Sequence, residues 1–277
     1  MQRLRAAAPG FEEAFARLVA SRRESGCEVT ADVAAILAEV RERGDAAVAD
    51  YTRRFDGFDL GEDWRIGADE CRAAYESLDT DLRAALELAA ARIRAYHEQQ
   101  LPKDRDYTDA AGMRLGARWL PVEAAGLYVP GGRASYPSSL LMNAIPARVA
   151  GVERLVVVTP TPRGAANPLV LAAAHICAIG EIWRVGGAQA VAALAYGTGR
   201  IAPVDVITGP GNAWVAEAKR QLFGVVGIDM VAGPSEILVI ADAANDPAWI
   251  AADLLRQAEH DPAAQSILIT DDESSPD

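Results

Sequence analysis

The sequence has few cysteines, few aromatic residues and a deficit of positive charge. Cys27, Cys71 and Cys177 are its 3 cysteines, and no two of them form a Cys-x-x-Cys pair. This spacing argues against a disulfide framework or a cysteine-based zinc site and fits a reducing cytoplasm. Lys and Arg number 27 against 39 Asp and Glu, which gives a net charge of -12. Because nucleic-acid binding needs a basic face, the charge argues against a general role on nucleic acid.

Long hydrophobic runs are also missing. The first ten residues lack the apolar segment of a signal peptide, and the apolar stretch Leu169–Ile179 is too short for a membrane span and is broken by His175. Apolar residues still make up 51% of the 277 residues, enough for one large domain or two smaller ones with a sizeable core. We expect a soluble cytoplasmic protein with no membrane partner.

The first hundred residues have the periodicity of helices. Apolar residues recur at helical spacing over 29–43 and 45–55, and Gly57 ends the second segment. The longest predicted helix covers 79–100 and should bury one apolar stripe. That stripe consists of Leu82, Leu86, Leu88, Ile93 and Tyr96.

From about residue 113 onward, short strands alternate with helices. Strands are predicted over 113–120, 125–129, 155–159, 182–185, 204–208, 237–241 and 266–270. Helices are predicted over 167–179, 188–196, 213–223 and from 245 onward. This alternation predicts an α/β fold with Rossmann-like parallel sheets and helices on both faces, preceded by a helical N-terminal region.

The pattern divides the chain into three parts. Residues 1–124 are predicted to be the helical N-terminal part of a first α/β domain, and 125–234 a second, Rossmann-like α/β domain. Residues 235–277 are predicted to return to the first domain. The chain stops directly after a predicted strand, where a parallel sheet normally continues with a crossover helix. We therefore expect the first domain to be incomplete at the C-terminus.

The last predicted helix ends in Gln257-Ala-Glu-His-Asp. It opens with an Asx cap and Pro247 in its first turn. Gln257 and His260 are three residues apart and project from one face, so a carbonyl oxygen and a ring nitrogen supply half of a zinc shell. The alternative, favoured by the motif alone, is a surface Gln and a His⁺ at the negative helix end. Four apolar residues should face the core, namely Trp249, Ile250, Leu254 and Leu255.

Three glycine-containing loops follow predicted strands, at the edge where open α/β sheets bind ligands. They are Gly126-Leu-Tyr-Val-Pro-Gly-Gly, Val185-Gly-Gly-Ala-Gln-Ala and Thr208-Gly-Pro-Gly-Asn-Ala-Trp. Tyr128 offers a ring and a hydroxyl, Gln189 falls in the first turn of a helix, and Asn212 is placed to cap the next helix. None has the GxGxxG fingerprint, so each loop alone favours an ordinary strand-to-helix turn. Ser235, at the entry to a strand, points into a cleft or belongs to a turn.

In chain order, the sequence contains the loop at Gly126, Tyr136-Pro-Ser-Ser-Leu-Leu-Met-Asn-Ala-Ile-Pro-Ala, the loops at Gly186 and Thr208, Val231-Ala-Gly-Pro-Ser-Glu and Gln257-Ala-Glu-His-Asp. Taken together and in this order, these segments closely resemble histidinol dehydrogenases. The resemblance covers nearly the whole chain and is strongest over 126–261. It implies an NAD-dependent, four-electron oxidation of L-histidinol to L-histidine through the aldehyde, with one zinc per site, in a homodimer.

The resemblance also implies residue roles. Tyr128, Gln189 and Asn212 match NAD-contacting positions of the family. Ser235 matches a substrate-contacting position. Gln257 and His260 match two of the zinc ligands, and that zinc also holds the substrate.

The family's catalytic Glu-His pair and its other Asp and His zinc ligands match no position up to Asp277. The sequence has 3 histidines, His97, His175 and His260, and none substitutes for the pair. We therefore expect weak zinc binding and no turnover from these residues alone. Two alternatives are a truncated, non-catalytic remnant that at most binds NAD or a partner subunit, and a generic α/β nucleotide-binding protein. Zinc and NAD titrations separate these hypotheses.

Overall fold

The chain forms two compact units, residues 1–231 and residues 232–277. The structure is a computed structural model, and the residues it describes are 2–24, 29–131, 136–231, 236–258 and 264–271. No helix within these ranges is long and apolar enough to cross a membrane. Cys71 and Cys177 are buried free thiols, while Cys27 lies outside the described residues. The predicted division into 1–124, 125–234 and 235–277 remains a prediction.

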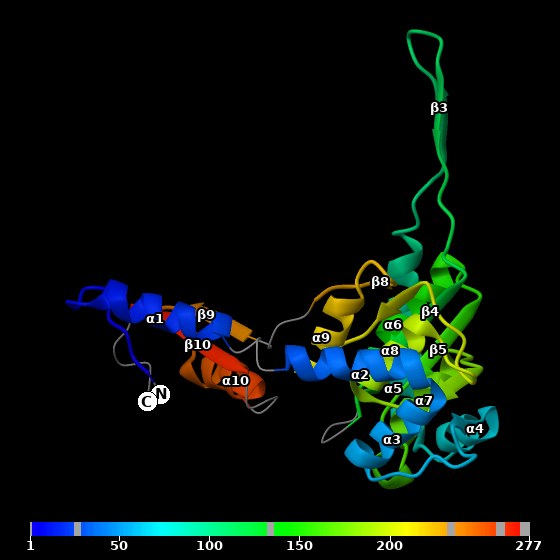
Figure 1. Cartoon of the computed structure of the whole chain (residues 1–277). Coiled ribbons are helices and arrows are strands. Elements are labelled where there is room, and N and C mark those ends of the chain that lie inside the picture. Colours follow the sequence, from blue (N-terminus) through cyan, green and yellow to red (C-terminus); the bar gives the residue numbers. More distant parts are fainter. Residues whose placement is uncertain (1, 25–28, 132–135, 232–235, 259–263, 272–277) are drawn as a thin grey trace. The chain divides into compact units, whose positions relative to one another are not determined.

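The first unit is built around a 6-stranded sheet that includes β4, β5 and β8 (Figure 1). Its strand order is β1-β6-β5-β4-β7-β8. Neighbours from β6 to β8 pair in parallel, and β1 joins antiparallel at the β6 edge. The fold class predicted from the sequence, a Rossmann-like α/β architecture, is confirmed. The strands are β1 (Arg65–Ile66), β4 (Ala124–Tyr128), β5 (Arg154–Val158), β6 (Glu181–Trp183), β7 (Val206–Thr208) and β8 (Gly227–Ile228).

The order of the strands reverses beside β4. The chain runs outward from β4 through β5 to β6, then returns to place β7 and β8 on the other side of β4. In open α/β sheets a ligand crevice lies at such a reversal, outside the carboxyl ends of the strands. The topology therefore singles out the carboxyl ends of β4 and β7.

Helices cover both faces of this sheet. One buried cluster joins residues of α2, α3, α8 and α9 to one face, and a second joins α4, α5, α6 and α7 to the other. The central strands are apolar on both sides; Val156, Val157 and Val158 are fully buried, which is typical of a parallel sheet between helix layers. The helices of this unit are α1 (Phe11–Glu24), α2 (Thr30–Arg43), α3 (Asp45–Asp56), α4 (Ala68–Glu76), α5 (Thr80–Glu98), α6 (Pro137–Ala150), α7 (Pro168–Ile176), α8 (Gly187–Tyr196) and α9 (Ala213–Leu222).

The apolar stripe predicted for α5 is narrower than expected. Leu86 is buried, but Leu88 and Tyr96 are 59% and 64% exposed. The residues of α5 that join the buried cluster with α6 and α7 are Leu86, Ala89, Ala90 and Ile93. The prediction that the stripe includes Leu88 and Tyr96 was wrong.

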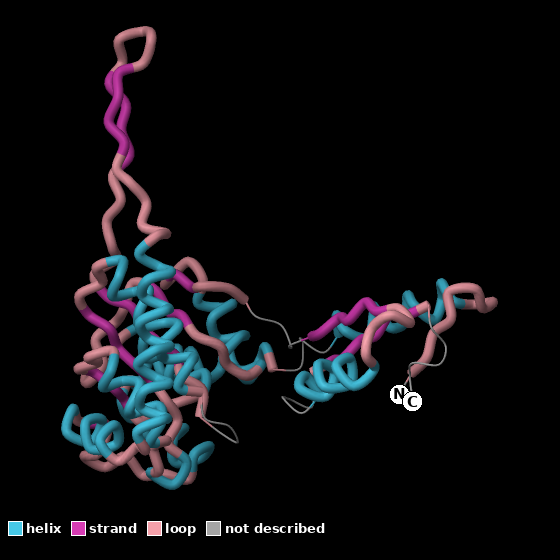
Figure 2. Tube along the Cα trace, turned by 180° about the vertical axis from the view of Figure 1, so that it is seen from behind, coloured by secondary structure: helices cyan, strands magenta, loops and turns pink. Residues whose placement is uncertain are grey.

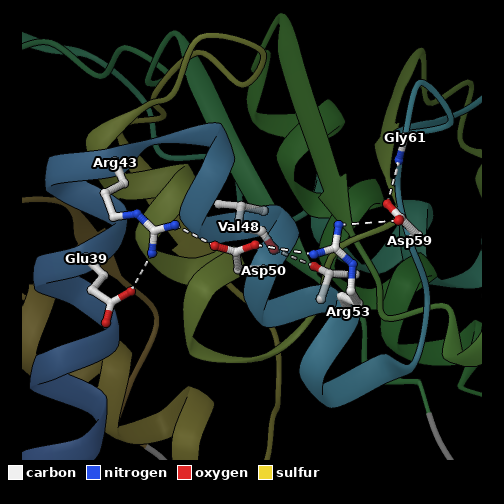
Figure 3. Close-up of polar contacts among 8 residues, drawn as sticks. Glu39, Arg43, Val48, Asp50, Arg53, Asp59 and Gly61 are labelled. Carbon is white, nitrogen blue, oxygen red and sulfur yellow. Dashed lines mark hydrogen bonds and ion pairs between the residues drawn. The ribbon is translucent and has the colours of Figure 1, made fainter.

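A chain of surface ion pairs links α2 to α3 and to the segment that follows. Arg43 bridges Glu39 of α2 and Asp50 of α3, and Arg53 bridges Asp50 and Asp59 (Figure 3). All of these side chains are exposed, so each pair contributes little to stability. Gly57, in the left-handed conformation with φ +62°, ends the helix as the sequence predicts.

Strands β2 (Arg105–Thr108) and β3 (Arg114–Ala117) form an antiparallel hairpin. Every residue of both strands is exposed. Figures 1 and 2 show the hairpin extending away from the body of the first unit. The strand predicted over 113–120 therefore exists in part, and its partner β2 was not predicted.

The second unit is a parallel β-α-β element of β9 (Glu236–Ala241), α10 (Pro247–Ala258) and β10 (Gln265–Thr270). The predicted Asx cap is Asp246, whose Oδ1 accepts the Ala248 N–H at 2.9 Å. Ile250 is buried, whereas Trp249 and Leu255 are 77% and 67% exposed. The prediction that all four apolar residues face a core was wrong for these two, because α10 meets only β9 and β10 within its unit.

Candidate functional site

Three predicted site residues lie at the carboxyl edge of the sheet, where the strand order reverses. Tyr128 is the last residue of β4, Gln189 is in the first turn of α8, and Asn212 immediately precedes α9. Strands β4 and β7 are direct neighbours, so the loops that follow them meet. The fold thus brings together side chains separated by 84 positions or fewer in the sequence, from Tyr128 to Asn212.

Tyr128 is buried and joined to the start of α8. Its hydroxyl oxygen accepts a hydrogen bond from the Gly187 backbone N–H at 3.0 Å. Burial raises the pKa of Tyr128 to about 12. The hydroxyl therefore stays protonated at physiological pH and keeps a proton that it can donate.

Gln189 is 1% exposed, yet its Oε1 has no hydrogen-bond partner among the residues that the structure describes. Leaving a buried acceptor unpaired costs about 1–3 kcal/mol. Gly187 has φ +67°, and a Cβ there would lie 2.6 Å from that oxygen. The sequence therefore keeps a glycine beside an amide that still has a free acceptor.

Two threonines at the same edge share this property. Thr161 follows β5 and Thr208 ends β7, and within the described ranges the Oγ1 of each is buried without a partner. Pro160, next to Thr161, packs so closely on Gly131 and Gly186 that a Cβ at either glycine would lie within 2.8 Å of the ring. Sequence reasoning missed both threonines. Thr208 ends a predicted strand, which was a usable signal, whereas Thr161 lies three residues beyond β5.

Asn212 caps α9, as the sequence predicts. Its Oδ1 accepts the backbone N–H groups of Trp214 and Val215 at 3.1 and 3.2 Å. The loop before it starts at Gly209, which has φ +116° and lies against Tyr128; a Cβ on Gly209 would be 2.1 Å from the Tyr128 carbonyl oxygen. Only glycine fits this close approach.

The C-terminal end of α3 also reaches this edge, which the sequence did not indicate. The rings of Phe55 and Trp214 are 6.4 Å apart. The Oδ2 of Asp56 is buried and has no partner in the described part of the chain. Burial raises the pKa of Asp56, and the negative charge of Asp56 adds to the rise in the pKa of Tyr128.

The remaining predicted site residues belong to the second unit. Gln257 is the penultimate residue of α10, and its Nε2 is buried without a partner among the described residues. Ser235 and His260 lie outside those residues. No three His, Cys, Asp or Glu side chains converge as metal ligands in the described ranges. The structure therefore tests the surroundings of Gln257 but not the Gln257–His260 pair.

Comparisons with known proteins agree on one family. Residues 20–277 match the family described as histidinol dehydrogenase. The chain is 64% identical over 264 residues to histidinol dehydrogenase from Zymomonas mobilis, covering 95% of this chain and 61% of that protein. It is 63% identical over 276 residues to that of Rhodospirillum rubrum, covering 99% of this chain and 64% of the relative.

A solved structure is also similar. The crystal structure of histidinol dehydrogenase from Elizabethkingia anophelis matches with a TM-score of 0.82 at 38% sequence identity. The match covers 89% of this chain and 57% of that protein. The chain thus spans 61% of the length of the curated relative from Zymomonas mobilis.

Proposed function

The chain belongs to the histidinol dehydrogenase family, and we propose that it forms the NAD-binding part of an oxidoreductase that converts L-histidinol to L-histidine. The oxidation removes four electrons and passes through the aldehyde, so each turnover reduces two NAD⁺. The reaction is a step of histidine biosynthesis. NAD⁺, when bound, supplies the hydride acceptor.

One observation supports the NAD site above all. Unpartnered buried oxygens of Thr161, Gln189 and Thr208 gather at the carboxyl edge of the sheet, beside the reversal of strand order. Ribose hydroxyls and a carboxamide bring the donors that such oxygens lack. Gly131, Gly186 and Gly209 let the three loops pack closely against Pro160 and Tyr128. The first turn of α8 offers backbone N–H groups to phosphates.

The residues divide the work of binding. Gln189 accepts a hydrogen bond from the dinucleotide, and Tyr128 donates its hydroxyl proton while holding Gly187. Asn212 keeps the N-terminus of α9 in place and presents its amide beside it. These roles for Tyr128, Gln189 and Asn212 orient the cofactor, and orientation of the reactants lowers the barrier to reaction.

The second unit carries the proposed metal and substrate side. Gln257 and His260 are proposed zinc ligands, and Ser235 a contact of L-histidinol. The side-chain amide of Gln257 supports its proposed role as a ligand, because its Nε2 is buried and forms no hydrogen bond with the described residues. Zinc, when bound, orients the substrate. The proposed protein is a homodimer whose residues 235–277 return to the first domain.

The proposed general acid and base are a Glu-His pair that no position of this sequence matches. We therefore propose that the 277 residues bind NAD but do not by themselves form NADH from histidinol. A generic nucleotide-binding role explains the fold but not the family match over residues 20–277.

Calorimetric titration with NAD⁺ tests the proposal. Saturable binding is expected, and Gln189→Ala should weaken it about tenfold, because a tenfold change corresponds to about 1.4 kcal/mol, the size of one hydrogen bond. The matched control is Gln221→Ala, which removes an amide of α9 that bonds to Thr30 and Glu217 instead. Absence of NAD⁺ binding, or equal weakening by both substitutions, contradicts the proposed site.

A further inference from the structure

Lys219 of α9 is a buried cation, 3% exposed. Buried lysines are rare unless they are paired. Its Nζ donates to the Gly209 carbonyl oxygen at 3.0 Å and forms an ion pair with Asp229. Asp229 directly follows β8, so the pair joins the helix after the Gly209 loop to the neighbouring strand.

Asp229 holds the other side of the same glycine. Its Oδ2 accepts the Gly209 N–H at 2.9 Å, and its own N–H donates to the Ile207 carbonyl oxygen at 3.2 Å. The N–H and the carbonyl of Gly209 are therefore both hydrogen-bonded to members of one ion pair. A pair of apolar side chains of the same size could form neither hydrogen bond.

Gly209 is the point where the loop touches the rest of the proposed site. Its φ of +116° and its close approach to the Tyr128 carbonyl leave no freedom for a side chain. The Asn212 cap fixes the other end of the loop on α9. A displacement of Gly209 would therefore move the start of this loop away from Tyr128.

We propose that Lys219 and Asp229 are positioning residues for the dinucleotide. Their hydrogen bonds to the backbone of Gly209 hold the Gly209–Asn212 loop against Tyr128, and neither side chain contacts the cofactor. This inference rests on the proposed function, since it needs NAD to bind at this edge. A buried ion pair contributes little net stability compared with apolar residues. Its value here lies in supplying one donor and one acceptor to the backbone of a single residue, Gly209.

The test compares Lys219→Met with the double variant Lys219→Met/Asp229→Asn in the whole chain. The single change leaves the Asp229 charge unpaired, so the unfolding midpoint should fall. The double change removes that charge and should restore most of the midpoint. NAD⁺ affinity should stay about tenfold or more below the unsubstituted chain in both variants, because Gly209 has lost its donor.

A matched control is Arg154→Met/Glu181→Gln. Arg154 and Glu181 form a partly buried ion pair, with Nε and Oε2 3.0 Å apart, at the opposite edge of the same sheet where β5 and β6 begin. The Arg154→Met/Glu181→Gln variant should have a lower unfolding midpoint than the unsubstituted chain, and its NAD⁺ affinity should stay within twofold of that chain. If the double variant at Lys219 and Asp229 regains NAD⁺ affinity together with stability, the pair is merely structural and the inference fails. If the unsubstituted chain binds no NAD⁺, the proposed function fails as well.

Discussion

Unpartnered oxygen atoms distinguish one edge of the sheet from the rest of the core. In the described part of the chain, buried side-chain oxygens without a partner belong to Asp56, Thr161, Gln189 and Thr208. All four side chains lie at strand ends, a helix start or the end of α3 that reaches this edge. A folded protein tolerates such a cost where function requires it.

The buried carboxyl of Asp56 should make the stability of the chain depend on pH. Burial raises its pKa above the unfolded value. An acid of this kind contributes stability below its unfolded pKa, and this contribution is lost as the pH rises through the folded pKa. Asp56→Asn should therefore stabilise the chain at pH 7, because it removes the partly desolvated negative charge that raises the pKa of Asp56. Urea unfolding at pH 7 and at acidic pH measures this, and the gain should shrink in acid.

Asp59 is the control for that experiment. Hydrogen bonding to Arg53 lowers the pKa of Asp59, the opposite direction. Asp59→Asn should not stabilise the chain at neutral pH, since it removes a favourable partner of Arg53. Equal gains from both substitutions would mean that reduced net charge, not burial of Asp56, is the cause.

The sequence pattern indicated some of the site residues and missed others. Tyr128, Gln189 and Asn212 stand in glycine loops after strands, a pattern visible in the sequence, although their NAD roles come from the family resemblance. Thr161 and Asp56 were not predicted, because a buried atom without a partner is a property of tertiary packing. Local sequence around them shows only a strand end and a helix end.

At the scale of elements, periodicity predicted most helices and parallel strands but not how wide a face each one buries. Leu88 of α5 has the right spacing and is exposed, because the helix meets its partners along one narrow line. Helix α6 was not predicted as a helix, since it begins with Pro137 and contains Pro146, two residues that usually mark helix boundaries. Strand β2 is short, charged and fully exposed, so no apolar alternation marks it.

The β2–β3 hairpin is predicted to contribute little to the free energy of unfolding. All residues of its two strands are exposed. Replacing 105–117 by a short Gly-Ser linker should therefore leave the free energy of unfolding within about 0.5 kcal/mol, the usual effect of changes at exposed sites. Calorimetric unfolding measures this.

Leu86→Ala serves as the comparison for the hairpin replacement. Leu86 is buried between α5 and the second cluster, so its loss should cost about 2–5 kcal/mol. A hairpin replacement as damaging as Leu86→Ala would show that the hairpin supports the fold of the isolated chain.

At the scale of the whole molecule, the two units hold different parts of the proposed enzyme. The first unit contains the six-stranded sheet, both buried clusters and the proposed dinucleotide site. The second contains Gln257 and the chain positions proposed for zinc and substrate. Dinucleotide binding is therefore the property that the first unit should show through its own residues.

A groove elsewhere on the first unit provides a contrast to the proposed dinucleotide site. A groove of about 350 Å³ lies between α2 and the C-terminal end of α8, lined among others by Leu37, Arg41, Glu42 and Tyr196. It contains none of the three predicted cofactor residues. The location of bound NAD⁺ thus separates binding at the carboxyl edge of the sheet from binding elsewhere on the same unit.

Hydrogen exchange followed by mass spectrometry, with and without saturating NAD⁺, locates the ligand most directly. Slower exchange is predicted for backbone amides in 126–131, 186–190 and 209–215, because these loops and helix starts surround the unpartnered oxygens. Protection confined to the groove around Arg41 and Tyr196, or unchanged exchange in all three segments at saturation, would contradict the dinucleotide site at the carboxyl edge of the sheet.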